Sequence, residues 1–130
     1  MKSISVLIVE DQQAWQELYR DILASSGYFF EVAISFEKAI EKLQNKDFDV
    51  AILDKRLNDE IEDDEGGIEV LKWLVDSGKK TKVILISAAP IEQDIKYAYE
   101  TANIYHFMDK TSLSAVDLIG HIKMIADDLD

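Results

Sequence analysis

The sequence has no cysteine, a single proline and few cationic residues. Without cysteine, neither a disulfide framework nor a thiolate zinc site can form. The 14 Lys and Arg residues stand against 26 Asp and Glu residues, which gives a net charge of −12. This excess of negative charge argues against direct binding to nucleic acid or to anionic membranes, because both depend on cationic patches. We therefore expect any contact with nucleic acid to be made by a partner.

Long apolar stretches are also missing. No segment is apolar for long enough to serve as a signal peptide or a membrane span, so the cytoplasm is the expected location. The chain has 130 residues, of which 48% are hydrophobic and 31% are charged. This composition is typical of a globular protein, and the length fits one domain over residues 1–130.

Short apolar runs alternate with amphipathic segments along the chain. Five runs are predicted to be strands, at residues 4–9, 29–34, 50–53, 83–86 and 104–108. Strict alternation of this kind predicts βαβ units, and right-handed crossovers place helices on both faces of the resulting sheet. The expected fold class is therefore α/β, a doubly wound sheet of five parallel strands with five helices.

Helical spacing of apolar residues predicts the buried helix faces. Asp11 opens the first helix, Ser35 caps the second, and Gly27 and Gly78 end the first and third. The fourth helix is expected over residues 90–101, with Pro90 in its first turn. The expected core faces are Ala14, Trp15, Leu18, Tyr19, Ile22 and Leu23; Phe36, Ala39, Ile40 and Leu43; Ile68, Leu71, Leu74 and Val75; and Leu113, Val116, Ile119, Ile122 and Ile125. Trp73, like Trp15, is expected to be a core or helix-flank aromatic.

Four polar residues lie at or just past the C-terminal ends of separate apolar runs. They are Asp11, Asp54, Ser87 and Lys110. If the runs are parallel strands, these side chains gather at the edge of the sheet where ligands bind in open α/β folds. With Glu10, the acids would form a crowded group of like charges, which needs a neutralising cation. Mg²⁺ suits such a group, because it prefers oxygen ligands and often binds one or two carboxylates beside a phosphate.

Each of these residues also has an ordinary structural explanation. Asp11 can cap a helix, Asp54 can begin a loop, Ser87 can enter a turn, and Lys110 can be a solvated surface lysine. Their conjunction favours a functional explanation. A hydroxyl and an ammonium facing carboxylates are what a phosphoryl group on Asp54 would need.

The motifs resemble those of the receiver domain of two-component response regulators, over nearly the whole chain. Val-Leu-Ile-Val-Glu10-Asp11 is similar to the acidic pair of that family, and Ala-Ile-Leu-Asp54-Lys-Arg-Leu to its phosphoacceptor motif. Ile-Leu-Ile-Ser87-Ala resembles its switch hydroxyl, and Phe107-Met-Asp-Lys110 its switch aromatic and its lysine. The resemblance implies a flavodoxin-like sheet with strand order 2-1-3-4-5.

By this resemblance, Asp54 is the nucleophile that accepts a phosphoryl group. Asp11 would bind Mg²⁺ directly, Glu10 would act through water, and the backbone carbonyl of Arg56 would complete the metal site. The family tunes water access through the residue two positions after the phosphoacceptor, so the Arg56 side chain is expected to lengthen the life of the phosphorylated state.

The resemblance also implies a switch and partners. Ser87 and Lys110 would hold the phosphorylated state, and Phe107 is either a packed aromatic or a rotameric switch. The donor would be a histidine kinase or a phosphotransfer protein. The signal would leave through the fourth helix, the last strand and the last helix toward a downstream effector or output domain, and a homodimer through this face is left open. The domain would catalyse only its own phosphorylation and dephosphorylation, so it is not expected to be an enzyme.

Two rival functions differ in class. The first is a phosphorylation-independent adaptor, which would tolerate losing any of the four strand-end residues. The second is a phosphatase that forms an aspartyl phosphate. Such enzymes usually carry a second acid two residues after the nucleophile, where this chain has Arg56.

Three features depart from the family pattern. Thr111 follows Lys110 where the family usually has a cis proline, which leaves the geometry of this bond open. Residues 59–65 contain six acids and lengthen the loop after Asp54, and Gly66-Gly67 replaces Asp-Gly. The acidic loop is expected to be a solvated segment. Because it follows Asp54, it is also a candidate to repel small anionic phosphodonors and attract a basic partner surface.

Overall fold

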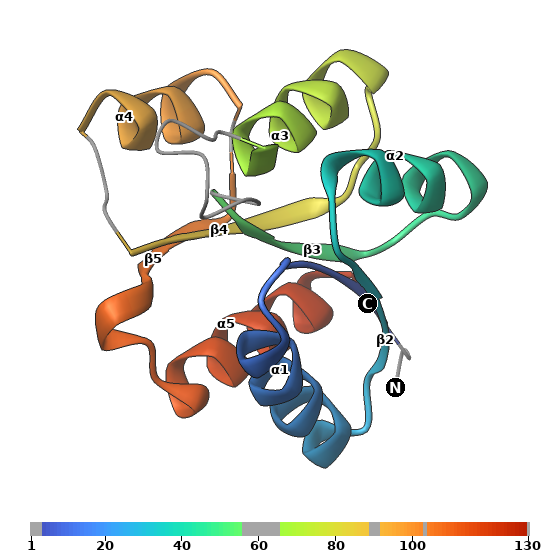
Figure 1. The fold of residues 1–130 in the computed structure, drawn as a ribbon, viewed down its shortest axis with the longest axis vertical. Helices are drawn as coiled ribbons and strands as arrows, with labels where there is room; N and C mark the ends of the chain where they lie inside the picture. Colours follow the sequence, from blue (N-terminus) through green and yellow to red (C-terminus); the bar gives the residue numbers. More distant parts are fainter. Residues whose placement is uncertain (1–3, 56–65, 89–91, 103, 130) are drawn as a thin grey trace.

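The computed structural model describes residues 4–55, 66–88, 92–102 and 104–129 (Figure 1). Strands and helices alternate along the chain, as the hydrophobic pattern predicts. The elements are β1 Ser5–Val9, α1 Gln13–Ser26, β2 Phe29–Ala33, α2 Phe36–Asn45, β3 Val50–Asp54, α3 Gly66–Ser77, β4 Lys82–Ser87, α4 Glu92–Glu100, β5 His106–Asp109, the 3-10 helix η1 Lys110–Ser112 and α5 Ala115–Asp128. No helix in these described ranges is long and apolar enough to cross a membrane.

The strands form one parallel sheet in the order β2-β1-β3-β4-β5. Helices α2, α3 and α4 cover one face, and α1 and α5 cover the other (Figure 1). Successive residues of a strand point to opposite faces, so β1 sends Leu7 and Val9 into one core cluster and Val6 and Ile8 into the other. The doubly wound α/β fold and the 2-1-3-4-5 order are both confirmed.

The helix ends follow local chemistry. Ser35 caps α2, since its hydroxyl oxygen accepts a hydrogen bond from the Lys38 backbone N–H at 3.2 Å. Gly27 and Gly78 have φ angles of +76° and +72°, a left-handed conformation that glycine adopts without strain. These three predictions are confirmed. The prediction that Asp11 opens the first helix is wrong, because α1 begins at Gln13 and Gln12 is its N-cap.

The predicted helix faces are partly wrong. In α5, Val116 is 80% exposed, and the buried stripe is Leu118, Ile122 and Ile125. The helix starts only after its N-cap Ser114, so Leu113 lies outside it, but Leu113 and Ile119 still pack against the core cluster that holds Ile122 and Ile125. Leu18 and Val75 are also exposed, at 42% and 41%, whereas Tyr19, Ile22 and Leu23 of α1 and Ile68, Val70, Leu71 and Leu74 of α3 are buried.

The peptide bonds of the segment after β5 are trans. The described residues contain no cis peptide bond, and the chain passes from Lys110 through Thr111 into η1. The Asp109 carboxylate accepts hydrogen bonds from the Thr111 backbone N–H at 2.9 Å and from its hydroxyl at 2.7 Å. These contacts fix the turn that follows Lys110.

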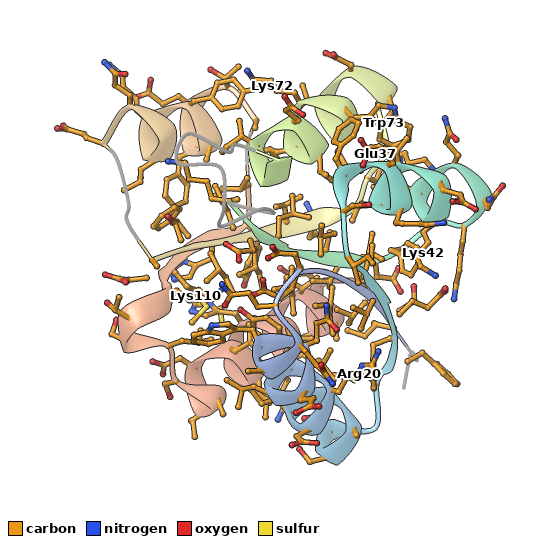
Figure 2. The ribbon with its side chains drawn as sticks, viewed as in Figure 1. Arg20, Glu37, Lys42, Lys72, Trp73 and Lys110 are labelled. Carbon is orange, nitrogen blue, oxygen red and sulfur yellow. The ribbon has the colours of Figure 1, made fainter. Side chains whose placement is uncertain are left out.

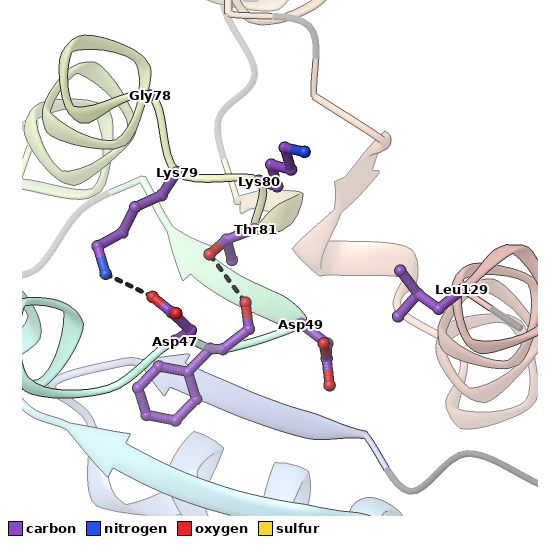
Figure 3. A pocket seen from close by; sticks show the side chains of 8 residues that line it. Asp47, Asp49, Gly78, Lys79, Lys80, Thr81 and Leu129 are labelled. Atoms are coloured by element: carbon purple, nitrogen blue, oxygen red, sulfur yellow. Dashed lines mark hydrogen bonds and ion pairs between the residues drawn. The ribbon is translucent and has the colours of Figure 1, made fainter.

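A hollow of about 330 Å³ lies at the amino-terminal edge of the sheet (Figure 3). The loops that precede β3 and β4 form most of its wall, and Leu129 closes one side. The Lys79 ammonium donates to the Asp47 carboxylate at 2.8 Å, and the Thr81 hydroxyl donates to the Phe48 carbonyl at 2.8 Å. This hollow is therefore at the edge opposite to the polar strand ends.

Candidate functional site

The carboxyl ends of four strands bring the polar residues of the sequence pattern to one edge. Asp54 is the last residue of β3 and Ser87 the last of β4, while Glu10 directly follows β1 and Lys110 directly follows β5. The strand register sets Asp54 beside Ile86 and Ser87 beside Asp109. Residues that are up to a hundred positions apart in sequence thus meet at a single edge.

Three carboxylates and one ammonium form the centre of this edge. Glu10, Asp11 and Asp54 each offer a carboxylate oxygen, and these atoms all lie within 4.8 Å of one another. The Lys110 Nζ donates to Glu10 Oε1 and to Asp54 Oδ2, both at 2.7 Å, and it lies close to the end of β5 (Figure 2). Glu10, Asp54 and Lys110 are all buried, and Asp11 is half-buried. We call these four residues the acid cluster.

Burial and the neighbouring charges shift the pKa values of Glu10 and Lys110 in the acid cluster. Burial raises the pKa of Glu10 to about 8, and the neighbouring Asp54 carboxylate adds to the effect more than the Lys110 ammonium reduces it. Burial alone would lower the pKa of Lys110, but its contacts with Asp54 and Glu10 outweigh burial and raise that pKa. Lys110 therefore stays charged, and one ammonium faces three carboxyl groups.

The donor set of the acid cluster fits a hard divalent cation. All three candidate ligands are carboxylate oxygens, and they are close enough to meet at one ion. The single positive charge of Lys110 does not balance the negative charge of the cluster, and a bound cation would neutralise the remainder. The predicted fourth ligand, the carbonyl of Arg56, lies outside the described residues, as does the acidic loop 59–65.

Ser87 and Phe107 lie where the motif pattern expects them. Ser87 is 2% exposed at the end of β4. Phe107 is half-buried and packs against the core cluster that contains Leu85. Its backbone N–H donates to the Tyr99 hydroxyl at 2.8 Å, which ties β5 to α4. Phe107 is therefore a packed aromatic in this structure, and its role as a switch stays a prediction.

Gly67 is a part of the site that sequence reasoning missed. A Cβ atom at Gly67 would lie 1.8 Å from the carbonyl oxygen of Asp54, and the Gly67 backbone N–H donates to the Lys55 carbonyl at 2.9 Å. The first turn of α3 thus rests directly on the backbone of Asp54. Two successive glycines at the start of a helix lower its stability. Such a pair in the sequence therefore indicates a place where another backbone segment comes close, and this signal was available.

Trp15 and Lys55 were also missed. The Lys110 Nζ lies 4.5 Å from the centre of the ring of Trp15, which is in the first turn of α1. Apolar spacing predicts Trp15 only as a core or helix-flank aromatic, and no sequence signal places it beside Lys110. Lys55 is only 5% exposed although it follows Asp54 directly, and nothing in the sequence pattern marks it as buried.

Comparisons with known proteins define the class of this chain. The sequence matches the family profile of the response regulator receiver domain over residues 6–123. The chain therefore belongs to this family, whose members are the receiver domains of two-component systems. Receiver domains bind Mg²⁺ at an acidic pocket and are in general not enzymes.

Solved structures show the same fold. A CheY-like receiver domain protein from Methanospirillum hungatei has a TM-score of 0.86 at 24% identity, covering 98% of this chain and 96% of that one. A two-component response regulator from Clostridium difficile has a TM-score of 0.85 at 18% identity, covering 98% and 99%. The response regulator TrrA from Thermotoga maritima, in complex with Mg(2+)-BeF, has a TM-score of 0.75 at 23% identity, covering 94% and 98%. No curated protein sequence matches the chain significantly.

Proposed function

We propose that this chain, over residues 1–130, is a phosphoacceptor module that receives a phosphoryl group on Asp54. The donor is the phosphohistidine of a histidine kinase or of a phosphotransfer protein. The observation that carries the proposal is the Asp54 carboxylate, held 2.7 Å from the Lys110 ammonium inside the acid cluster. A carboxylate oxygen of Asp54 attacks phosphorus while the P–N bond of the donor breaks, and the departing imidazole nitrogen keeps the electron pair.

Asp11 and Asp54 are the proposed direct ligands of Mg²⁺, with Glu10 acting through water and Arg56 through its carbonyl. When bound, Mg²⁺ supplies positive charge that neutralises the phosphoryl oxygens. The crowding of three carboxylates within 4.8 Å supports this assignment, and so does the complex of TrrA with Mg(2+)-BeF.

Lys110 and Ser87 are proposed to hold the phosphorylated state. The Lys110 ammonium already lies beside Asp54, so it can reach a phosphoryl oxygen on that residue with little rearrangement. The Ser87 hydroxyl lies at the end of the neighbouring strand and is the proposed second donor. A shift of Ser87 toward the phosphoryl group would make room for Phe107 to move inward.

The signal is proposed to leave through α4, β5 and α5, toward a downstream effector or output domain. Phe107 belongs to β5, and its backbone bond to Tyr99 connects that strand to α4. Tyr99, Val116 and Met124 are large apolar side chains that α4 and α5 leave exposed. Each of the two helices therefore offers exposed apolar area to a partner.

The test is exposure of the purified chain to a small phosphodonor with Mg²⁺, followed by intact mass. The wild type should gain one phosphoryl group, and Asp54→Asn should gain none. Asp49→Asn is the matched control, because Asp49 precedes the same strand at its opposite end. Equal labelling of Asp54→Asn and the wild type would refute the site, and a wild type that takes up no phosphoryl group from any donor would favour the adaptor function.

A further inference from the structure

The Lys110 ammonium has contacts on two sides. Two carboxylates, those of Glu10 and Asp54, accept its hydrogen bonds at 2.7 Å. Among the described residues no third hydrogen-bond acceptor contacts this Nζ, although an ammonium has three N–H donors. The face of the Trp15 ring lies 4.5 Å from the same nitrogen, within the range of a cation–π contact. The indole therefore takes the place of a third polar partner.

Trp15 is itself held in place by α1. Tyr19 follows it by one helical turn, and the two ring centres are 6.1 Å apart with an angle of 34° between the planes. Tyr19 is 1% exposed and belongs to the core cluster between the sheet and α1, against which Trp15 packs. The indole cannot turn away from Lys110 without disturbing this packing.

Tyr19 also shows how close this aromatic pair lies to the acid cluster. Burial raises the pKa of Tyr19, and the negative charges of Glu10 and Asp54 raise it further. Its hydroxyl is buried and has no hydrogen-bond partner in the described part of the chain. The Trp15 ring, backed by Tyr19, thus covers the Lys110 ammonium from the side of α1.

We propose that Trp15 is a positioning residue, which holds the Lys110 ammonium between Glu10 and Asp54 and so aims it at the phosphoryl group. The inference rests on the proposed function, since it concerns the transfer of that group to Asp54. A charge that is already in place costs no reorganisation when charge develops in the transition state. The ring also keeps water from that side of the ammonium, and a lower local dielectric strengthens the attraction.

The contact itself can be tested without phosphorylation. The ε-methylene protons of Lys110 should show an upfield ring-current shift in NMR spectra of the wild type. Trp15→Leu should remove this shift, because leucine is apolar but has no ring. Trp73→Leu is the control. Trp73 belongs to α3, on the other face of the sheet (Figure 2), so this variant should leave the Lys110 shift unchanged. A wild-type shift equal to that of Trp15→Leu would overturn the contact.

The role in phosphoryl transfer is tested by the rate of labelling with a small phosphodonor at saturating Mg²⁺. A cation–π contact changes an equilibrium by up to about five-fold at an exposed site and by about thirty-fold when desolvated. Trp15 is half-buried, so Trp15→Leu should be labelled about ten-fold more slowly. Trp15→Phe keeps a ring that attracts cations less strongly, and it should be roughly three-fold slower than the wild type. Trp73→Leu should match the wild type.

The outcomes separate this inference from the proposed function. If the wild type is labelled and Trp15→Leu is labelled equally fast, Trp15 has only a packing role and the inference fails. If Trp15→Phe and Trp15→Leu slow the reaction equally, the ring is not the cause and the inference also fails. A folded wild type that shows the ring-current shift but accepts no phosphoryl group would instead overturn the proposed function. Should Trp15→Leu not fold, a Trp15→Phe rate equal to that of the wild type would overturn the inference.

Discussion

Gly67→Ala should destabilise the protein, although alanine favours helices more than glycine does. The added Cβ would lie 1.8 Å from the Asp54 carbonyl oxygen, 2.6 Å from its carbonyl carbon and 2.8 Å from the Lys55 Cα. All three atoms belong to the backbone of β3 and its end. No side-chain rotation can relieve these contacts, so either α3 or the end of β3 must move.

The size of the effect follows from two opposing contributions. Replacing glycine by alanine inside a helix gains at most about 1 kcal/mol from propensity. Forcing an extra carbon into a packed site costs about 1–3 kcal/mol through shifts of side chains and backbone, and occasionally more. The Gly67 contacts are with backbone atoms, which puts the cost at the upper end of this range, so we expect a net loss of about 2 kcal/mol in the free energy of unfolding.

Gly120→Ala provides a matched control. Gly120 lies within α5, and a Cβ there would meet nothing within 4 Å. This variant should gain roughly 0.5–1 kcal/mol. Urea unfolding followed by circular dichroism measures both variants. If Gly67→Ala is as stable as the wild type while Gly120→Ala is stabilised, the close approach of α3 to Asp54 is refuted.

Three further predictions concern charge. Mg²⁺ at ten times its Kd should raise the free energy of unfolding by about 1.4 kcal/mol, and Asp11→Asn should lose most of this gain; an equal response of both proteins would count against the metal site. Because the pKa of Glu10 rises from 4.5 to about 8 on folding, metal-free wild type should lose stability as the pH increases through this window. Glu10→Gln should lack this loss, and parallel pH profiles of urea midpoints would contradict it. Burial and the charge of His121, stacked at 3.9 Å, lower the pKa of His106, so stability should fall as the pH drops below 6.5. His121→Gln should reduce that fall, and an unchanged pH profile would exclude the pair as its cause.

The fold was predictable because its strands are marked by composition. The run at residues 4–9 is apolar and rich in β-branched residues, as expected for a strand covered on both faces, and β1 is buried between β2 and β3. The gathering of Asp54, Ser87 and Lys110 at one edge was predictable for a related reason. Parallel strands place their carboxyl ends together, so residue type and chain position were enough.

Contacts between distant elements were not predictable in the same way. Apolar spacing identifies a helix but not the width of the stripe it buries, so Leu18 and Val116 were assigned to the core although both are exposed. The contact of Trp15 with Lys110 depends on how α1 lies across the sheet. The contact of Gly67 with Asp54 depends on where α3 begins. The pair of glycines signals a close backbone approach, but no local pattern identifies Asp54 as the partner.

The most direct test of the central claim is to identify the residue that carries the phosphoryl group. The chain is labelled with a small phosphodonor and Mg²⁺, reduced with borohydride, which converts an aspartyl phosphate to homoserine, and mapped by peptide mass spectrometry. We expect homoserine in place of Asp54 in the wild type, with Glu10 and Asp11 unmodified. Modification at another residue, with Asp54 intact, would contradict it.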